Sequence, residues 1–396
     1  MTVTVSVHDR GATHEYHYPE PARCLVGRGE DCDIRVPHRR VSRRHCLLET
    51  DPPMVWVRDL GSRNGTFVGG RRVDPLADRL LGDGDELSLG GVRDLVLRLT
   101  VPGPFRAPLP ETFAGYDLVR EIGRGAQGIV HLARHRGTGE YVAVKRMPTH
   151  PAADDSARFA FLREYETLRA LRHPHVVAFH SGVLTDDEFC FACEYCRGGG
   201  LDRLVVRRGG RLPVGDALPI TLQVLDALAY AHDAPVPALG ERGVSSARGL
   251  VHRDVKPHNI LLSDQDGGVV KLGDFGLAKS FEYAGLSGHT RTGAFGGSVP
   301  FTPRTQLLGY RDAGPEVDVW AAAACLYWML TGATPRDFPA GSDPVAVGLR
   351  EPVVPVRRRL PSLGTRLADV LDEALVDRPA HRITRAEEFA SALRAV

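Results

Sequence analysis

Lysine is scarce in this chain of 396 residues, in which only four of the 50 basic residues are lysines and the rest are arginines. No stretch of 18 or more apolar residues occurs either, which argues against a transmembrane helix. An excess of charge is also missing, because the formal net charge is +1. This balance argues against bulk binding of nucleic acid or of a membrane surface. With 43% apolar residues, the composition is that of folded globular domains.

The chain does not begin with the apolar core of a signal peptide, so export is not expected. Its seven cysteines, an odd number, are interpreted as free thiols in a reducing cytoplasm. Cys190, Cys193 and Cys196 have a spacing that could hold a metal or an iron–sulfur cluster. On a strand, however, Cys190 and Cys193 would point to opposite faces, which favours buried apolar side chains instead.

Three segments of different character follow one another along the chain. Short apolar runs separated by turn residues predict an all-β sandwich over 1–100. Four prolines in 101–115 disfavour a helix or a central strand and predict a semi-rigid linker. Over 116–396, strands come first and helices later, which predicts an α+β domain. Within that domain, the Pro- and Gly-rich segment 233–249 is expected to be an exposed loop.

The sequence EIGRGAQGIV holds Gly123, Gly125 and Gly128. Alone, this spacing could equally be glycines scattered in turns. Two strand-like segments joined by RGTG follow it, however, rather than the helix that a dinucleotide-binding fold requires. Such a hairpin can fold its backbone over phosphates, because glycine leaves room for close approach. Lys145, at the end of the second segment, could then reach phosphate oxygens.

A second lysine, Lys256, lies in LVHRDVKPHNILL, two residues after Asp254 and three before Asn259. The spacing indicates a site that needs a compact point charge near a base and a metal ligand. The sequence GDFG follows further along the chain. With these motifs in this order, residues 116–394 resemble a eukaryotic-type protein kinase domain, of the kind directed to serine and threonine.

The resemblance implies a bilobal fold and a phosphoryl transfer that uses ATP with Mg²⁺ (or Mn²⁺). It implies that Asp254 orients the substrate hydroxyl and accepts its proton, while Lys256 lies close to the transferred phosphoryl group. Glu164, on the helix expected in FLREYETL, would pair with Lys145. Phosphoryl transfer depends on this kind of positioning and charge neutralisation more than on covalent chemistry.

By the same resemblance, Asn259 and Asp274 would hold the metal ions. Cys193 would line the back of the adenine pocket, and backbone groups of Glu194 and Cys196 would bond the adenine. The full set assigned to the nucleotide is Ile122, Gly123, Gly125, Gly128, Val130, Ala143, Lys145, Glu194, Cys196, Leu261 and Asp274.

One departure from the kinase pattern lies after the activation segment. Kinases usually close that segment with Ala-Pro-Glu, whose glutamate pairs with an arginine near the carboxy terminus. This chain has FTPRTQLL, which puts Thr305 at the glutamate position and leaves Arg382 without that partner. We therefore expect Thr305→Glu to restore a pair and stabilise the domain. The departure is the only support for an alternative function, a pseudokinase scaffold in which the amino-terminal domain carries the activity and the kinase fold only docks partners.

Residues 24–98 resemble a forkhead-associated (FHA) domain, a β-sandwich that binds phosphothreonine peptides. The match rests on VGRGEDCDIRVPHRRVSRRHCLLE, DLGSRNGTFVGG and LGDGDELSLG. Taken singly, RRVSRR could be a solvated charged loop and RNGTF a hairpin turn. The residues that the resemblance assigns to the phosphopeptide are Arg28, Ser42, Arg43, Arg63 and Asn64. These residues offer the donors that a phosphate needs, and His45 is expected to brace their loops from behind.

The partners implied are therefore proteins with acceptor serines or threonines, and proteins that carry phosphothreonine. Arg253 before Asp254 is typical of kinases switched by phosphate on the activation segment. That segment offers Thr290 and Thr292 as candidate autophosphorylation sites. The FHA domain could bind the product, preferably between two chains, which would give a phosphorylation-dependent homodimer. Other phosphoproteins fit the same domain equally well.

Overall fold

The structure is a computed structural model. It describes residues 2–9, 12–51, 54–75, 78–81, 84–92, 95–100, 115–125, 128–148, 168–184, 188–240, 243–264, 268–275, 299–309, 313–377 and 380–396. The chain divides into two compact units, an amino-terminal and a carboxy-terminal one, each of which is considered by itself. Apart from Gly115, the segment predicted to be a linker lies outside the described residues.

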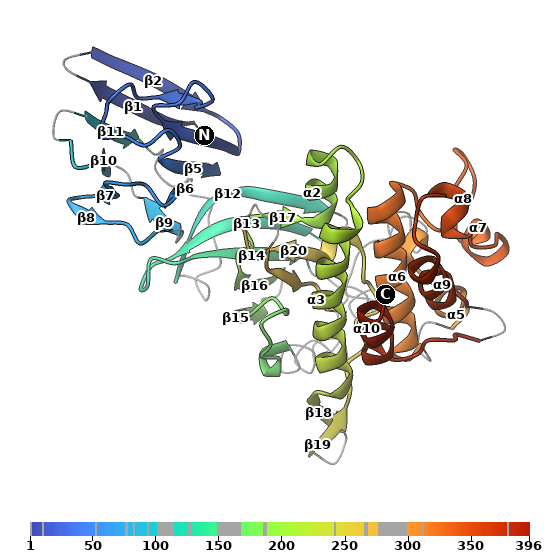
Figure 1. The fold of residues 1–396 in the computed structure, drawn as a ribbon. Coiled ribbons are helices and arrows are strands. Elements are labelled where there is room, and N and C mark those ends of the chain that lie inside the picture. The colour runs from blue at the N-terminus through green and yellow to red at the C-terminus, as the bar shows by residue number, and fades with distance from the viewer. Residues whose placement is uncertain are drawn as a thin grey trace. The chain divides into compact units, whose positions relative to one another are not determined.

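The amino-terminal unit consists of two β-sheets (Figure 1). The order of strands in the first sheet is β2 (Ala12–Tyr18), β1 (Val3–Asp9), β11 (Leu95–Thr100), β10 (Glu86–Leu89), β7 (Thr66–Val68) and β8 (Arg71–Arg72). The order in the second is β4 (Ile34–Arg35), β3 (Ala22–Gly27), β5 (Cys46–Asp51), β6 (Met54–Asp59) and β9 (Asp78–Leu81). Alternate residues of both sheets, such as Val5 and Leu97 in one and Leu48 and Val57 in the other, are fully buried in one core. The predicted β-sandwich is confirmed.

The carboxy-terminal unit begins with a five-stranded antiparallel sheet (Figure 1). The strand order is β12 (Tyr116–Gly125), β13 (Gly128–His135), β14 (Tyr141–Pro148), β16 (Glu188–Glu194) and β15 (Phe179–Leu184). The Gly-rich sequence lies at the turn between β12 and β13, and Lys145 lies within β14. Of the helix expected over FLREYETL, the described part is the end, where 168–170 are helical.

Helices dominate the rest of this unit, as predicted. They are α2 (Leu201–Arg207), α3 (Val214–Asp233), α5 (Arg304–Leu308), α6 (Glu316–Thr331), α7 (Pro344–Arg350), α8 (Val356–Arg359), α9 (Thr365–Ala374) and α10 (Ala386–Arg394). Helix α6 is buried on nearly all sides, as its apolar sequence requires, and it packs beside α3 (Figure 1). It ends at Gly332, whose φ of 74° is the left-handed conformation favoured for glycine at a helix end.

A small sheet of β17 (Gly199–Gly200), β20 (Ile260–Leu262) and β21 (Val270–Leu272) interrupts the helices. It carries the segments that the sequence assigns to catalysis. A short 3₁₀ helix, Pro257–Asn259, leads directly into β20, and Asp274 follows β21 by two residues. The catalytic loop and the GDFG sequence are thereby placed on neighbouring strands.

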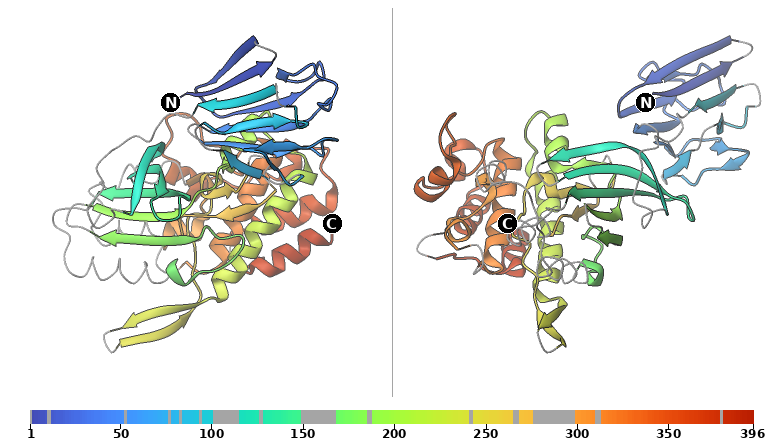
Figure 2. Two further views of the ribbon diagram at one scale, coloured as in Figure 1. Left: turned by 90° about the vertical axis from the view of Figure 1, so that its left-hand side faces the viewer. Right: turned by 180° about the vertical axis from the view of Figure 1, so that it is seen from behind.

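The segment 233–249 is not the loop that its composition suggested. It forms a two-stranded hairpin of β18 (Pro235–Gly240) and β19 (Gly243–Arg248), which extends past the end of α3 (Figures 1 and 2). Its prolines are tolerated because, within the described parts of the chain, each strand of this two-stranded sheet has a free edge, where no backbone N–H is needed for pairing. Across the described parts of the chain, no helix combines the length and apolarity needed to span a membrane.

Candidate functional site

The catalytic loop is held in place by one buried carboxylate, that of Asp318 in α6. Its oxygens accept hydrogen bonds from the backbone N–H groups of His252 and Arg253, both at 2.7 Å, and from His232 Nε2 at 2.9 Å. Arg253 has a φ of 62°, which is unfavourable for a residue with a side chain. Such strain costs about 1–3 kcal/mol, and the bonds to Asp318 help offset it. Asp318 was not predicted from the sequence, although an acid at the start of the otherwise apolar run VDVWAAAACLYWML was a signal.

Asp254 is brought together with the two residues predicted to work beside it. Lys256 Nζ lies 2.9 Å from Asp254 Oδ2, and Asn259 Nδ2 donates to the same oxygen at 3.1 Å and to the Asp254 carbonyl at 2.8 Å. The Asp254 side chain is 8% exposed. These bonds fix the orientation of the carboxylate. Because the Asn259 amide nitrogen serves as a donor, its oxygen remains as the atom that can ligate a cation.

Asp274 lies across from this loop and meets Lys145. Lys145 Nζ is 2.9 Å from Asp274 Oδ2, while His252 Nε2 donates to the carbonyl of Gly273 at 2.9 Å. Phe275 packs against the His252 ring, with centroids 4.5 Å apart. The histidine therefore joins the catalytic loop to the GDFG segment. Glu164, the predicted partner of Lys145, lies outside the described residues.

The sheet register puts the predicted nucleotide residues of three strands on one face. Val130 pairs with Lys145 across β13 and β14, and Ala143 pairs with Cys193 across β14 and β16. Directly opposed residues share a face, and alternate residues of a strand do too, so these four side chains lie on the same side. Cys190, by contrast, belongs to the opposite face. Ile122 and Leu261, the other apolar candidates, are half-buried.

Of Gly123 and Gly128, only Gly128 is required by its own backbone surroundings. Gly128 has a φ of 129°, and a Cβ added there would come within 2.1 Å of the Arg146 carbonyl oxygen. At Gly123 an added Cβ would meet Val130 at an ordinary 3.9 Å. Gly128 therefore permits the close passage of β13 beside β14 as well as the turn.

Glu194, in the stretch predicted to bind adenine, is tied to neighbouring segments through its side chain and its backbone. Glu194 Oε2 lies 2.9 Å from Lys271 Nζ of β21, and the Glu194 N–H donates to the Ala178 carbonyl at 2.8 Å. Of the Glu194 backbone groups, the carbonyl is therefore the one suited to bind adenine. Burial raises the pKa of the Cys193 and Cys196 thiols to about 12, so both are neutral apolar groups.

The end of the activation segment differs from the expectation. Thr305 Oγ1 lies 2.8 Å from His381 Nε2, and Arg382 is not left without an acid, because its Nη1 is 3.9 Å from Glu373 Oε1. Arg382 is 65% exposed, so it carries no buried charge to be compensated. The buried arginine of this region is Arg304, which was not predicted from the sequence. Thr290 and Thr292 lie outside the described residues.

In the amino-terminal unit, two loops meet where the phosphopeptide residues were predicted. Ser42 Oγ accepts a hydrogen bond from the Arg63 N–H at 3.1 Å, and Asn64 Nδ2 donates to the Arg40 carbonyl at 2.8 Å. The Arg28 N–H donates to the Ser42 carbonyl at 3.0 Å. The arginine side chains, including that of Arg43, are exposed, whereas Ser42 and Asn64 are half-buried.

His45 braces these loops from behind, as expected. It is fully buried, its Nδ1 accepts from the Ser42 N–H at 3.0 Å, and its Nε2 lies 3.2 Å from the Gly65 carbonyl. A ring that accepts at Nδ1 and donates at Nε2 is the neutral imidazole. Burial lowers the pKa of His45 in agreement with this, since it disfavours the charged form.

Comparisons with known proteins match both units. The family models that match are described as "Protein kinase domain", over residues 116–393, and "FHA domain", over 24–90. Serine/threonine-protein kinase cds1 of Schizosaccharomyces pombe is 27% identical over 389 residues, which cover 91% of this chain and 79% of that protein. Serine/threonine-protein kinase PknI of Mycobacterium tuberculosis is 33% identical over 285 residues, which cover 71% of this chain and 42% of PknI.

Solved structures show the same folds. A crystal structure of Rad53 residues 1–466 in complex with AMP-PNP covers 100% of both chains, with a TM-score of 0.58 at 22% identity. That likeness concerns the fold alone. The crystal structure of the M. tuberculosis PknI kinase domain covers 73% of this chain and 99% of its own, with a TM-score of 0.51 at 31% identity.

Proposed function

This chain belongs to the protein kinase family. We propose that it transfers the γ-phosphoryl group of ATP to serine and threonine hydroxyls of proteins. Its FHA domain recruits phosphothreonine-containing partners. The observation that carries the enzymatic part is the arrangement around Asp254, whose carboxylate is held by Lys256 and Asn259. A scaffold without catalysis would not require a carboxylate fixed in this way.

All seven cysteines are free, which supports a reducing, cytoplasmic location.

Asp254 serves as the residue that aligns the acceptor hydroxyl and takes its proton. Its two hydrogen-bonded neighbours restrict the carboxylate to one orientation, which is the main contribution that a protein makes to phosphoryl transfer. Lys256 carries a compact positive charge within 2.9 Å of that carboxylate. In this position it can also offset negative charge on the transferred group.

The nucleotide lies against the face shared by Val130, Ala143 and Lys145, with Leu261 on the opposite lobe. The Asp274 carboxylate and the Asn259 amide oxygen are the oxygen donors that Mg²⁺ prefers, so the residues present fit the ion. A bound Mg²⁺ would neutralise phosphate charge. Lys145, now 2.9 Å from Asp274, is the cation placed to bind phosphate oxygens when ATP is present.

The FHA domain recognises phosphothreonine through the loops that meet at Ser42. A hydroxyl, an amide and guanidinium groups from Arg28, Arg43 and Arg63 supply donors for a phosphate dianion. Neutral His45 fixes the two loops without adding charge. These side chains are exposed or half-buried, so a peptide can reach them.

The kinase assignment is tested by incubating the full chain with labelled ATP, Mg²⁺ and casein. Asp254→Asn should lower kcat by about 10²–10⁴, because general-base and positioning contributions have that size. Binding of ATP should be kept, since the carboxylate is assigned to the acceptor side. A wild-type protein that binds ATP but transfers no phosphate would instead support the pseudokinase scaffold.

The ligand of the FHA domain is proposed to include the chain's own activation segment, phosphorylated at Thr290 or Thr292. The proposal is supported by the position of both threonines between Asp274 and Thr305 and by an FHA domain in the same chain. Recognition between two chains would dimerise only phosphorylated kinases. Full-length Asp254→Asn protein, which cannot phosphorylate itself, should bind a peptide of residues 285–300 more tightly when either threonine is phosphorylated.

In the same titration, Arg28→Ala should weaken the binding free energy of the phosphorylated peptide by about 1.5–3 kcal/mol, the range for a hydrogen bond to a charged group. If the phosphorylated and unphosphorylated peptides bind equally, the ligand lies on another protein. Light scattering of the wild-type protein before and after autophosphorylation tests the dimer directly.

A further inference from the structure

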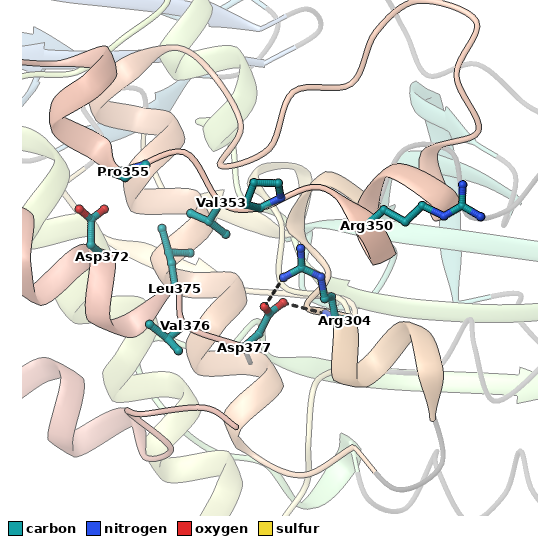
Figure 3. Close-up of a pocket in the computed structure, with 9 residues that line it drawn as sticks. Arg304, Arg350, Val353, Pro355, Asp372, Leu375, Val376 and Asp377 are labelled. Carbon is teal, nitrogen blue, oxygen red and sulfur yellow. Dashed lines mark hydrogen bonds and ion pairs between the residues drawn. The ribbon is translucent and has the colours of Figure 1, made fainter. Parts of the chain in front are cut away.

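The carboxylate of Asp377 is buried between two arginines from different parts of the helical lobe. Arg304 donates to it twice, from Nη1 to Oδ1 at 2.7 Å and from its backbone N–H to Oδ2 at 3.0 Å (Figure 3). Arg336 Nη2 donates to Oδ2 at 2.5 Å. The three side chains are 7%, 1% and 2% exposed for Arg304, Arg336 and Asp377. These residues are called the buried anchor below.

Both arginines have further partners that compensate for their burial. Arg304 Nε donates to the Leu349 carbonyl at 3.0 Å, and Arg304 Nη2 donates to the Glu351 carbonyl. Arg336 Nε donates to the same carbonyl at 3.1 Å, and its guanidinium lies 4.9 Å from the ring centroid of Trp320. A buried charge pair is well supported only when extra hydrogen bonds satisfy its remaining donors. All three guanidinium nitrogens of Arg304 make such bonds, as do Nε and Nη2 of Arg336.

The charge of Asp377 follows from the same contacts. Burial alone would raise the pKa of this carboxyl, but the positive charge of Arg336 and the N–H and charge of Arg304 together hold it below its usual range. Asp377 is therefore ionised at neutral pH. The cavity beside it, of about 400 Å³, is lined by Arg304, Arg350, Pro352, Val353, Pro355, Asp372, Leu375, Val376 and Asp377 (Figure 3).

The buried anchor joins the same two segments as the ion pair expected for the family, but with its charges exchanged. The expected pair has its acid at the end of the activation segment, at position 305, and its arginine near the carboxy terminus. In this chain the activation-segment side contributes the cation, Arg304, and the carboxy-terminal side contributes the acid, Asp377. A hydrogen bond between Thr305 and His381 lies next to it.

A hydrogen bond connects this end of the activation segment to the catalytic loop. Arg304 begins α5, and in the same helix Gln306 Nε2 donates to the carbonyl of Arg253 at 2.7 Å. Gln306 is 4% exposed, so water does not compete for this bond. Arg253 has the unfavourable φ of 62° and immediately precedes Asp254. Its N–H is held by Asp318 and its carbonyl by Gln306, so both sides of the strained residue are fixed.

We propose that Arg304, Arg336 and Asp377 act as positioning residues, which hold α5 so that Gln306 fixes Arg253 and thereby the orientation of Asp254. This proposal rests on the proposed kinase function. It predicts that damage to the buried anchor lowers kcat, whereas the affinity for ATP, which binds at a separate set of residues, is kept. If these residues contributed to stability alone, damage would lower the melting temperature without lowering kcat selectively relative to the affinity for ATP.

The first test compares Arg304→Met with Arg382→Met in the full chain, since the same substitution is made at a buried and an exposed arginine. Phosphate transfer to casein, the KM for ATP and the melting temperature are measured for both. We expect kcat of Arg304→Met to fall by about tenfold to a hundredfold, the size expected for a small displacement of a catalytic group. The KM for ATP should change by less than about twofold, because no nucleotide contact is lost. Arg382→Met should resemble the wild type.

The second test is Gln306→Leu, which leaves the buried anchor intact and removes only the bond to Arg253. This variant tests the positioning role even if Arg304→Met does not fold. We expect a fall in kcat of about tenfold with ATP affinity unchanged. Full turnover in Gln306→Leu, or equal losses in Arg304→Met and Arg382→Met, overturns the proposal. If the wild type is inactive, the proposed kinase function is overturned as well. If the wild type is active and the variants are unaffected, only the proposed role of the buried anchor is overturned.

Discussion

Lys271 Nζ lies 2.9 Å from Glu194 Oε2 and so joins β21, the strand before Asp274, to the stretch predicted to bind adenine. Lys145 and Lys256 make the corresponding contacts with Asp274 and Asp254, also at 2.9 Å. Every lysine in the described residues is thus paired with an acid around the nucleotide site. Lys279, the remaining one, lies outside them. In a chain that otherwise uses arginine, lysine is kept where a compact charge on a flexible stem is needed.

The Lys271–Glu194 pair should contribute to stability. Lys271→Met removes the cation and leaves Glu194, whose side chain is 29% exposed, without that partner. We expect a loss of about 1 kcal/mol in the free energy of unfolding, since the pair is only partly buried. Lys271→Arg, which retains the charge, is the control and should lose less. Equal stability of Lys271→Met and the wild type in a denaturant titration would count against this contribution.

Gly128 and Gly123 should respond differently to the same substitution. Gly128→Ala puts a Cβ within 2.1 Å of the Arg146 carbonyl oxygen at a φ of 129°, so β13 must move away from β14. The strained conformation alone costs about 1–3 kcal/mol, and we expect a lower melting temperature together with a higher KM for ATP. Gly123→Ala, whose nearest contact is 3.9 Å, is the matched control. If both variants behave alike, the close approach at Gly128 has no consequence.

The FHA loops should loosen in acid. Burial lowers the pKa of His45 below its usual 6.5, so the unfolded state binds a proton more readily than the folded state does. The full stability is therefore present above pH 6.5 and declines as the pH falls below it. The protection factors of residues 40–66 against hydrogen exchange, which are corrected for the intrinsic effect of pH, should fall over that range in the full chain. In His45→Asn the dependence should be weaker, and an unchanged dependence would assign it to another group.

Thr305→Glu should not produce the stabilisation that the sequence suggested. The intended partner, Arg382, is 65% exposed and already lies near Glu373. A surface pair contributes about 0–1 kcal/mol, and the substitution also removes the Thr305 hydrogen bond to His381. We expect the melting temperature to stay level or fall. A clear rise would mean that the new carboxylate has found a buried cation.

The sequence was sufficient for the two folds because their signals are local. Alternating valines in β1, turn residues between short strands and an apolar run in α6 each determine an element from a few neighbouring residues. The hairpin over 235–248 was missed because prolines usually argue against strands. They are acceptable there because each strand has a free edge among the residues that the structure describes.

The candidate catalytic residues could also be predicted from the sequence, because Asp254, Lys256 and Asn259 lie within one short loop. The residues that hold this loop in place could not be predicted from the sequence. Asp318 reaches it from 65 residues away and Gln306 from 53, and the partner of Arg304 lies 73 residues further along the chain. Such contacts leave no periodicity or spacing in the sequence. The sequence thus determined the residues suited to the chemistry, whereas the tertiary structure decided which buried charges meet, because the stability of a buried charge depends on the partners that folding brings to it.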